Sequence, residues 1–427
     1  MQTQNIVAEN VPPSRPGRGL VAIIVALFFA WGFCTVLVDT LIPKLKGLFS
    51  LSYAEVMLTQ FAFFLAYLVM SVPCGFVLSR LGYLRAIALG LLVMAGGCLL
   101  VTPAAQLGIY GMFLVALFVL ASGITLLQVA ANPLIAKLGD AAHTHVRLNL
   151  AQGFNSLGTT VGPLVGAAFI LAGGVNLPGD PSTLAPETLA ALRRQEAAVV
   201  QEPFMAIAAA LCLLALVIWM LRNRQGLPVV PRSGSATRLF APLRHRRLAM
   251  ATLCIFLYVG AEVSIGSLMV SYLMLDRTAA VSAQTAGRLV ALYWGGAMVG
   301  RFVGSIVMRR IPAASVLCAC AIGAVALATF SALSNGMIAA VSIIAVGLCN
   351  SVMFPTIFSL GIEHLGNEVP QGAALLCLAI VGGAVVPLIT GVTADYFGLA
   401  AALIVPIVCY LVIASFGTLA RAGVLDR

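Results

Sequence analysis

The chain has 427 residues, with 24 Lys and Arg against 14 Asp and Glu, and a net charge of +10. Charged residues make up 9% of the chain, whereas soluble domains carry about 25%, and hydrophobic residues make up 61%. This composition excludes a soluble globular fold, which needs polar surface facing water, and it excludes disordered, collagen-like and coiled-coil chains. The class that remains is an all-α polytopic membrane protein.

Residues 1–19 form a polar segment with three prolines ahead of the first apolar stretch. A charged start, a short apolar core and a small-residue cleavage site do not follow one another there, as they would in a signal peptide. We therefore expect this segment to be a cytoplasmic N-terminal tail.

Twelve apolar segments follow, and each is long enough as a helix to cross about 30 Å of hydrocarbon. Ser52 and Glu55 form a capping-box pattern, which favours a helix beginning at the second segment. We predict twelve transmembrane helices, over residues 20–42, 53–79, 83–104, 107–137, 147–173, 203–222, 248–275, 284–309, 313–334, 336–361, 370–395 and 399–421.

Lys and Arg are distributed unequally between the two sides of these segments. If the N-terminus is cytoplasmic, 17 of them lie on cytoplasmic segments and six on outer ones, while Arg301 lies within the eighth span. Because cytoplasmic loops carry such an excess, we expect both termini in the cytoplasm and a bacterial-type cytoplasmic (inner) membrane. The positive charge thus indicates topology. No basic stretch is interleaved with aromatic residues, which disfavours nucleic-acid binding.

Two longer connections divide the chain. Residues 174–202 contain three prolines and are expected to form an outer loop, whereas residues 223–247 are rich in arginine and contain no acid. The basic segment leaves six spans on each side. We expect four regions: a tail at 1–19, an N-terminal half at 20–222, a linker at 223–247 and a C-terminal half at 248–427.

The two halves contain a sequence echo at an offset near 224 residues. Equivalent residues recur in the same order in four pairs of spans, and duplicated transporter halves often leave such traces. The pattern predicts two six-helix halves related by a pseudo-two-fold axis. The matched pairs are Asp39 with Glu262, Gly75 with Gly304, Arg80 with Arg309, Pro133 with Pro355, Gly158 with Gly382 and Pro163 with Pro387.

Charged side chains inside the spans cost about 2.5–3.5 kcal/mol each on insertion scales and are functional candidates. Asp39 in the first span and Glu262 in the seventh are flanked by apolar residues. A carboxyl group withdrawn from water takes up a proton more readily, which suits a proton carrier. A structural ion pair between the halves, involving Arg301, is the alternative. Asp395, which closes the eleventh span, is expected to be an interfacial cap.

Amide side chains recur on single faces of the fourth and fifth spans. Gln128 and Asn132 are four residues apart, and Asn149, Gln152 and Asn155 follow at three-residue spacing. Such stripes must face the interior of the bundle, where groups that both donate and accept suit a polyol. Hydrogen bonding between helices is the alternative explanation.

Aromatic residues in the spans are candidates for stacking on the apolar face of a sugar ring. The candidates are Trp31, Tyr258 and Trp294, with Tyr293 and Phe154 beside them. Core packing, or a position at the lipid interface, is the alternative for each of these aromatics.

The sequence contains no pattern that calls for a cofactor or a metal. The ten cysteines lie in apolar runs without a CxxC pair, so we expect small buried hydrophobic residues. His143 and His145 form a weak metal pattern with no third ligand nearby, and every histidine lies in a loop. Because no nucleophile lies beside a base in the spans, we expect a protein that is not an enzyme.

The twelve-span plan with a basic central loop resembles the major facilitator superfamily. Residues 75–85 are similar to its signature between spans two and three, with Ser79 in place of the usual acid. The resemblance implies an inner gate locked by arginines, for which a positive-inside anchor is the alternative. The gate residues are Gly75, Arg80, Gly82, Arg85, Arg301 and Arg309.

The glycines of the fifth span, Gly158, Gly162 and Gly166, allow helices to approach closely. The same stretch partly resembles the signature of proton-driven drug exporters, in which Ala167 would be a glycine. Export of small amphiphilic compounds therefore stays open as an alternative function.

Five stretches spread over both halves together resemble the fucose permease-like family of sugar–cation symporters. The resemblance extends over residues 20–420, and the stretches are 39–43, 128–133, 147–158, 354–361 and 382–387. The family implies uptake of a monosaccharide with a cation, by alternating access around a central site. It implies that Asp39 is the proton-linked carboxylate and that Gln152 and Asn155 bind sugar hydroxyls. We expect the protein to act in the lipid bilayer as a monomer.

Two positions depart from the fucose-transporting branch. Gln128 stands where that branch has a glutamate, and Glu262 stands where it has an amide. Residues 260–267 and 293–301 look more like the glucose/galactose and N-acetylglucosamine transporters of the family. We therefore expect an aldohexose or its N-acetylamino derivative, with Asp39 and Glu262 coupling transport to protons. Sodium-coupled and L-fucose-type symport are the alternatives.

Overall fold

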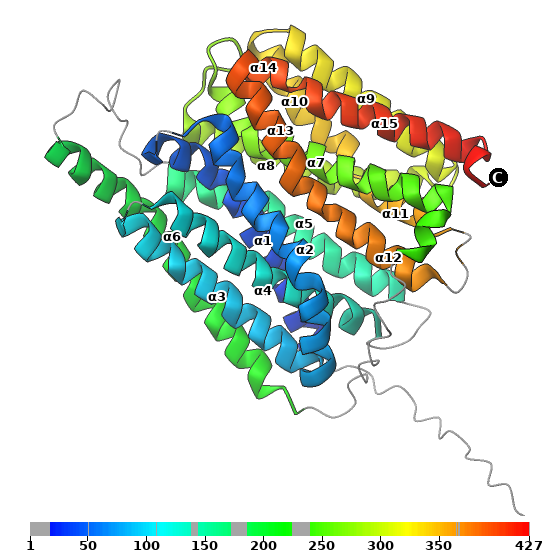
Figure 1. The fold of residues 1–427 in the computed structure, drawn as a ribbon, viewed down its shortest axis with the longest axis horizontal. Helices are drawn as coiled ribbons and strands as arrows, with labels where there is room; N and C mark the ends of the chain where they lie inside the picture. Colours follow the sequence, from blue (N-terminus) through cyan, green and yellow to red (C-terminus); the bar gives the residue numbers. More distant parts are fainter. Residues whose placement is uncertain are drawn as a thin grey trace, which may run out of the picture.

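The computed structural model describes residues 18–49, 51–107, 109–137, 144–171, 186–223, 240–363, 365 and 368–426. Long helices dominate this part of the chain, and no strand occurs among its residues. Figure 1 shows the helices alongside one another, with α1 to α6 in one group and α7 to α15 in another. The all-α class predicted from composition is confirmed.

The helices follow the predicted order of spans. The first group contains α1 (Arg18–Phe49), α2 (Tyr53–Leu81), α3 (Tyr83–Leu107), α4 (Tyr110–Lys137), α5 (Thr144–Gly166) with the π-helical η2 (Ala167–Leu171), and α6 (Pro186–Met220). The second begins with the short η5 (Ala241–Arg244), α7 (Arg246–Met274), α8 (Ala283–Val307) and α9 (Ala313–Leu333). It continues with α10 (Gly336–Asn350), α11 (Met353–Ile362), α12 (Val369–Leu378), η7 (Ala379–Val381), α13 (Gly382–Phe397), α14 (Leu399–Ala402), α15 (Ile404–Arg421) and η8 (Val424–Asp426).

The count of twelve spans is confirmed. Eleven helical segments within the described residues are long and apolar enough to cross a membrane. The twelfth span is α8, which has 25 residues and carries Arg288 and Arg301. At about 1.5 Å per residue, α8 is also long enough to cross about 30 Å of hydrocarbon.

Three spans of the second group are interrupted. Pro355 has no N–H to donate to the carbonyl of Ser351, and the tenth span divides there into α10 and α11. Pro406 stands in the same relation to Ala402, where α14 gives way to α15. In the eleventh span, η7 precedes Gly382. Proline thus accounts for two of the three breaks.

The predicted outer loop over residues 174–202 is wrong for its second part. Helix α6 begins at Pro186, because proline suits the first turn of a helix and the Ala, Leu and Glu residues after it are strong helix formers. The remainder of that loop, residues 1–17 of the tail and residues 224–239 of the linker lie outside the described residues. Helix α1 also passes Pro43 and ends at Phe49, beyond its predicted end.

The cysteines are all free thiols, but only part of them matches the expectation of burial. Five are buried, namely Cys34, Cys74, Cys98, Cys254 and Cys409. Cys212 and Cys377 are exposed on apolar helices. Because a membrane helix can turn an apolar thiol towards lipid, hydrophobicity alone did not distinguish these positions from the core.

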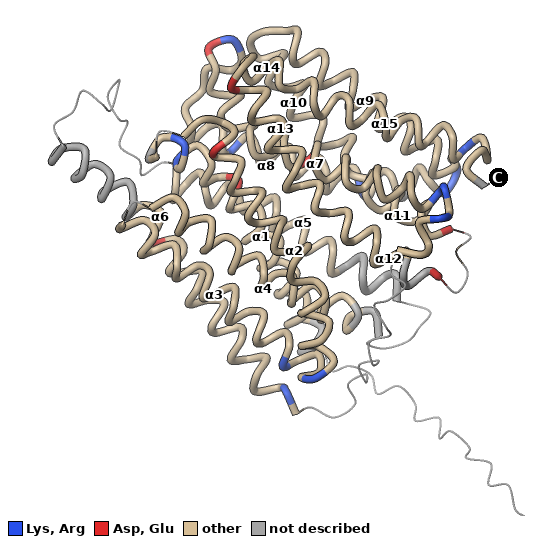
Figure 2. The backbone as a smooth tube through the Cα atoms, in the orientation of Figure 1, with Lys and Arg blue, Asp and Glu red and all other residues tan. Residues whose placement is uncertain are grey.

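Helix α1 begins and helix α15 ends at one end of the bundle, which we call the terminal end (Figure 1). The other end, which we call the far end, contains the start of α2 and the end of α13. Figure 2 shows the basic residues near these ends and mostly uncharged helices between them. Those at the terminal end include Arg80, Arg85, Arg222, Arg244, Arg309, Arg310 and Arg421, and those at the far end include Lys44, Lys46 and Arg277.

The predicted repeat has a physical counterpart in helix packing. A Cβ atom at Gly158 of α5 would overlap the carbonyl oxygen of Phe29 of α1. A Cβ atom at Gly382, its match in the second half, would overlap the carbonyl oxygen of Phe256 of α7. The paired glycines therefore let equivalent helices approach closely in the two halves, and the six-plus-six plan is confirmed.

The two halves meet mainly through α2 with α13, α5 with α8 and α1 with α7. At the far end, Gly391 of α13 packs on the backbone of Tyr53 of α2, and Gly287 of α8 packs on Leu171 of η2. The predicted capping box is also present there, since the Ser52 and Glu55 side chains bond each other's backbone N–H. The far ends of the two halves are thus packed against each other.

Candidate functional site

Asp39 lies on α1 at the boundary between the two halves. Its Oδ1 accepts hydrogen bonds from Gln60 Nε2 of α2, at 2.8 Å, and from Ser267 Oγ of α7, at 2.7 Å. The side chain is buried, with 8% exposure. A buried charge needs partners, and one of the two donors found here belongs to the opposite half.

Glu262 lies on α7, five residues before Ser267. Its Oε1 accepts a hydrogen bond from Tyr258 Oη at 2.7 Å, and the same hydroxyl lies 3.0 Å from the carbonyl oxygen of Asn350. Because Ser267 bonds Asp39, the structure places the two sequence-predicted carboxyl groups at the same junction between α1 and α7.

Tyr258 is a partner of Glu262 rather than an open stacking surface. Its ring is only 1% exposed. Tyr293 extends the same network, because its hydroxyl donates to the carbonyl oxygen of Glu262 at 3.2 Å and accepts from Asn350 Nδ2 at 2.8 Å. These contacts fix the position of α7 around Glu262.

Trp294 lies beside this network with an unsatisfied donor. Its ring meets that of Tyr293 edge-on, with centroids 5.2 Å apart, and its Nε1 is buried without a hydrogen-bond partner among the described residues. A Cβ atom at Gly266 would lie 3.2 Å from this ring and 3.9 Å from Asp39 Oδ2. The indole and the carboxylate thus both lie close to the face of α7 on which Gly266 has no side chain.

A second polar group forms in the first half. Gln128 Nε2 of α4 donates to Tyr67 Oη of α2 at 2.8 Å, and the same hydroxyl is hydrogen bonded to the side chain of Trp31 of α1. Asn132, one turn further along α4, has a buried Oδ1 without a partner among the described residues. Two predicted residues, Trp31 and Gln128, are therefore joined through one hydroxyl group.

The amides of α5 differ in their surroundings. Asn155 Nδ2 donates to the carbonyl oxygen of Phe28 at 3.1 Å, so this side chain ties α5 to α1. Gln152 is half-buried. The side chain of Asn149 and the whole of His143 lie outside the described residues. For Asn155, the interhelical bond that the sequence left as an alternative is present.

Arg301 bridges the halves at the level of this site. Its Nη1 donates to Ser156 Oγ of α5 at 2.6 Å, and its Nε donates to the carbonyl oxygen of Ser351 at 3.4 Å. That carbonyl is the one that Pro355 leaves without a helix partner. Arg301 also acts on Glu262 through its charge. The arginine thus joins α5, α8 and the break between α10 and α11.

Of the predicted gate residues at the terminal end, Arg80 contacts its own helix and Arg85 contacts the first residue of the linker. The Arg80 guanidinium lies 4.2 Å from the ring centroid of Phe76, and Arg85 Nη2 donates to Asn223 Oδ1 at 3.3 Å. Gly82 ends α2 with a φ of 79°, a left-handed value that favours glycine. Gly75 and Arg309 lie on the same side of the bundle. Their gating role stays a prediction.

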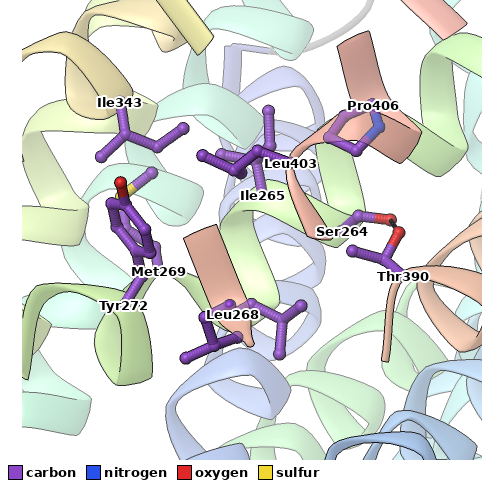
Figure 3. Close-up of a pocket in the computed structure, with 10 residues that line it drawn as sticks. Ser264, Ile265, Leu268, Met269, Tyr272, Ile343, Thr390, Leu403 and Pro406 are labelled. Carbon is purple, nitrogen blue, oxygen red and sulfur yellow. Dashed lines mark hydrogen bonds between the residues drawn. The ribbon is translucent and has the colours of Figure 1, made fainter. Parts of the chain in front are cut away.

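A small crevice in the second half is separate from these groups. Figure 3 shows that it is lined mainly by apolar side chains of α7, with others from α10 and from residues 399–406, and that Ser264 and Thr390 face each other. Thr390 Oγ1 donates to Ser264 Oγ at 3.1 Å, and Tyr272 Oη bonds to Ser331. Because its polar groups bond within the protein, this crevice is not the candidate site.

The sequence reasoning missed Gln60, Tyr67, Ser267 and Asn350, which hold the predicted residues in place. Gln60 and Asn350 carry the same signal as Gln128, an amide inside an apolar span, and that criterion would have found them. Ser267 and Tyr67 carry no such signal, since serine and tyrosine are common in membrane helices.

Comparison with known proteins identifies the family. Residues 20–376 match the Major Facilitator Superfamily. The chain is 45% identical over 396 residues to the glucose/galactose transporter of Brucella abortus (strain 2308), which covers 92% of this chain and 91% of that protein. It is 34% identical over 434 residues to the L-fucose-proton symporter of Escherichia coli (strain K12), and the match covers 97% of this chain and 96% of that protein.

Solved structures agree with this result. The transporter FucP in the outward conformation superimposes with a TM-score of 0.70 at 32% sequence identity, covering 94% of this chain and 98% of that one. A bacterial homolog of the lysosomal transporter Spinster shares the fold, with a TM-score of 0.73 at 17% identity over 97% of this chain and 99% of that one. The protein belongs to the Major Facilitator Superfamily.

Proposed function

We propose that the protein takes up a monosaccharide together with a proton, by alternating access. The substrate is an aldohexose such as glucose or galactose, or N-acetylglucosamine. The observation that carries the proposal is the carboxylate of Asp39, buried between the halves and bonded to both of them. The named activities of the glucose/galactose and L-fucose-proton relatives support the same class of substrate and cation.

The basic residues orient the protein in the membrane. Cytoplasmic loops carry the excess of Lys and Arg, so the terminal end faces the cytoplasm of a bacterial-type inner membrane. The far end then faces outward. Because the halves are packed together there, this structure corresponds to a state closed to the outside. The N-terminal half and the C-terminal half, joined by the basic linker, act as two rocking bodies within one monomer.

Asp39 and Glu262 carry the coupling. When the far end opens, Asp39 meets the outer solution and takes up a proton, which removes a costly buried charge as the halves close. Glu262 remains held by Tyr258 and accepts hydrogen bonds from sugar hydroxyls. Release of the proton and the sugar at the terminal end completes the cycle, and the proton gradient drives sugar inward.

The sugar contacts come from both halves. Gln128, Asn132 and Gln152 offer amides from the first half, and Trp294 offers an indole N–H from the second. The unpartnered Asn132 Oδ1 and Trp294 Nε1 support this role, because a buried polar atom without a partner gains most from a ligand hydroxyl. Trp31 offers its ring. Asn155 and Tyr258 support the site from behind, through Phe28 and Glu262.

The gate at the terminal end uses the arginines of the loops after α2 and α8. We propose that Arg80, Arg85 and Arg309 engage the opposite half when the terminal end closes, and that Gly75 and Gly82 shape the loop. Drug export has less support. Gly158 and Gly162 pack on Phe29 and Phe33 of α1, so helix packing explains the glycine stripe.

The test is uptake of radiolabelled hexose into membrane vesicles with an imposed pH gradient. We expect the labelled hexose to accumulate inside the vesicles when the outside is acidic. Unlabelled glucose, galactose or N-acetylglucosamine should inhibit this uptake according to how well each binds the site. L-Fucose serves as the competitor that should act weakly. Accumulation that requires sodium and ignores pH would replace the proton by sodium, and the absence of hexose transport under both gradients would refute the proposal.

A further inference from the structure

We infer that Ser267 is a positioning residue for proton coupling, because it bonds Asp39 only while the far ends of the two halves are together. This inference rests on the proposed function, since it concerns how Asp39 gives up its proton. It assigns a role to an uncharged residue of the second half, within the stretch 260–267.

The geometry places two donors on one oxygen. Gln60 Nε2 and Ser267 Oγ both bond Oδ1 of Asp39, at 2.8 and 2.7 Å. Ser267 is fully buried, and Gln60 is 3% exposed. Hydrogen bonds to an ionised carboxylate are roughly twice as strong as those to a neutral group, so both donors favour the charged form of Asp39.

The two donors differ in which half supplies them. Gln60 lies on α2, in the same half as Asp39, so its bond survives any rigid-body motion of the halves. Ser267 lies on α7, in the opposite half, so its bond is lost when α7 moves away from α1. Asp39 therefore has both donors with the far end closed, and Gln60 alone with it open.

This difference has the sign that uptake requires. Closure of the far end buries Asp39, which favours its protonated form and would hold the proton inside the protein. Glu262, the charged group of α7 that acts on Asp39 within the described residues, opposes a second negative charge nearby. The hydroxyl of Ser267 offsets both effects in the state from which the proton must leave towards the cytoplasm.

The second oxygen of Asp39 lies beside Gly266, the residue that precedes Ser267 on α7. A Cβ atom at 266 would lie 3.9 Å from Oδ2, the other oxygen of Asp39. Oδ2 accepts neither of the two bonds and is therefore the oxygen left to take up the proton in the proposed cycle.

The experiment compares two transport modes of the same protein in vesicles. Sugar exchange between two equilibrated sides needs no proton release, whereas accumulation driven by a pH gradient needs it at every turnover. For Ser267→Ala we expect accumulation to be slower by roughly tenfold or more, with exchange within about twofold of the unaltered protein. An alkaline interior should restore the rate, because it draws the proton off Asp39, while the dependence on external pH stays unchanged.

Matched variants keep the result interpretable. Ser342→Ala removes a buried hydroxyl that bonds only the Ile338 carbonyl of its own helix, so it should change neither mode. Ser267→Thr retains the hydroxyl and should retain accumulation. Equal loss of exchange and accumulation in Ser267→Ala, or normal accumulation, would overturn the inference. Failure of the unaltered protein to accumulate hexose under a pH gradient would overturn the proposed function as well.

Discussion

The carboxylate of Asp395, at the far end of α13, accepts a hydrogen bond from the backbone N–H of Tyr53 at 2.6 Å. Its second oxygen accepts from the N–H of Ala54 at 2.7 Å. These donors belong to the first turn of α2, which has no helix partners for them. The sequence predicts Asp395 as an interfacial cap, and the structure shows that the helix it caps belongs to the opposite half. The contact therefore exists only while the far end is closed.

Replacing Asp395 by Asn should favour opening of the far end. The change removes the charge at a helix N-terminus and one of the two acceptors, which costs the closed state about 1–2 kcal/mol. This corresponds to a shift of roughly five- to thirtyfold in the ratio of closed to open molecules. Distances between spin labels at the far ends of α2 and α13 measure that ratio.

Glu55→Gln is the matched control for this prediction, because Glu55 caps the same helix from within its own half. It should leave the distance distribution unchanged. If Asp395→Asn and Glu55→Gln give the same distribution, the cap contributes to the stability of α2 and not to closure.

Replacing Glu262 by Gln should weaken sugar binding while leaving the fold intact. A glutamine oxygen still accepts from Tyr258, but the charge that strengthens bonds to sugar hydroxyls is lost. Bonds to charged groups contribute about 1.5–3 kcal/mol, so we expect KM for hexose to rise roughly ten- to hundredfold. Exchange kinetics give this value. The control is Glu202→Gln on an exposed part of α6, and an unchanged KM in Glu262→Gln would remove Glu262 from the sugar site.

Replacing Trp294 by Phe should lower the affinity for sugar. The stability of the fold should not fall through a lost hydrogen bond. The indole Nε1 has no partner among the described residues, so nothing in the protein is left unpaired when it is removed. Loss of one neutral hydrogen bond to the sugar predicts a KM about two- to tenfold higher with an unchanged maximal rate. Trp219→Phe, on an exposed face of α6, should alter neither quantity. An unchanged KM in Trp294→Phe would contradict the assignment.

Replacing Gly158 or Gly382 by Ala should destabilise the corresponding half. In both cases the added Cβ overlaps a carbonyl oxygen of the neighbouring helix, so the helices must separate. Overpacking of this kind costs about 1–3 kcal/mol, which lowers the midpoint of thermal unfolding. Gly96→Ala adds a Cβ where no atom lies within 4 Å and should not lower it. Similar midpoints for all three variants would mean that the close contacts relax without cost.

The fold was predictable because polar or charged connections separate the apolar spans in the sequence. Apolar length gave the count of twelve, and the paired residues gave the two halves. The start of α6 was not predictable from apolarity, since residues 186–198 place four charged residues among Ala and Leu, all of them strong helix formers. The breaks near Ser351 and Leu403 follow from prolines four and three residues later, whose consequences depend on how the helices pack around them.

The residues of the site that could be predicted are those whose side chains cost free energy to place in lipid. Asp39 and Glu262 stood out because a charge in a membrane span needs a reason, and the structure brings them into one site. Their distinct environments were not predictable, because they depend on which side chain of another helix comes within hydrogen-bond distance. Asn155 illustrates the limit, since its spacing fits a sugar contact but its Nδ2 bonds the backbone of Phe28.

Proton coupling through Asp39 is tested most directly by replacing this residue with Asn. Asn at this position matches the protonated carboxyl group in shape but cannot release a proton. We predict that Asp39→Asn exchanges hexose across the membrane and does not accumulate it under a pH gradient, whereas the exposed control Asp276→Asn does both. Accumulation of hexose by Asp39→Asn at the level of the unaltered protein would contradict the account.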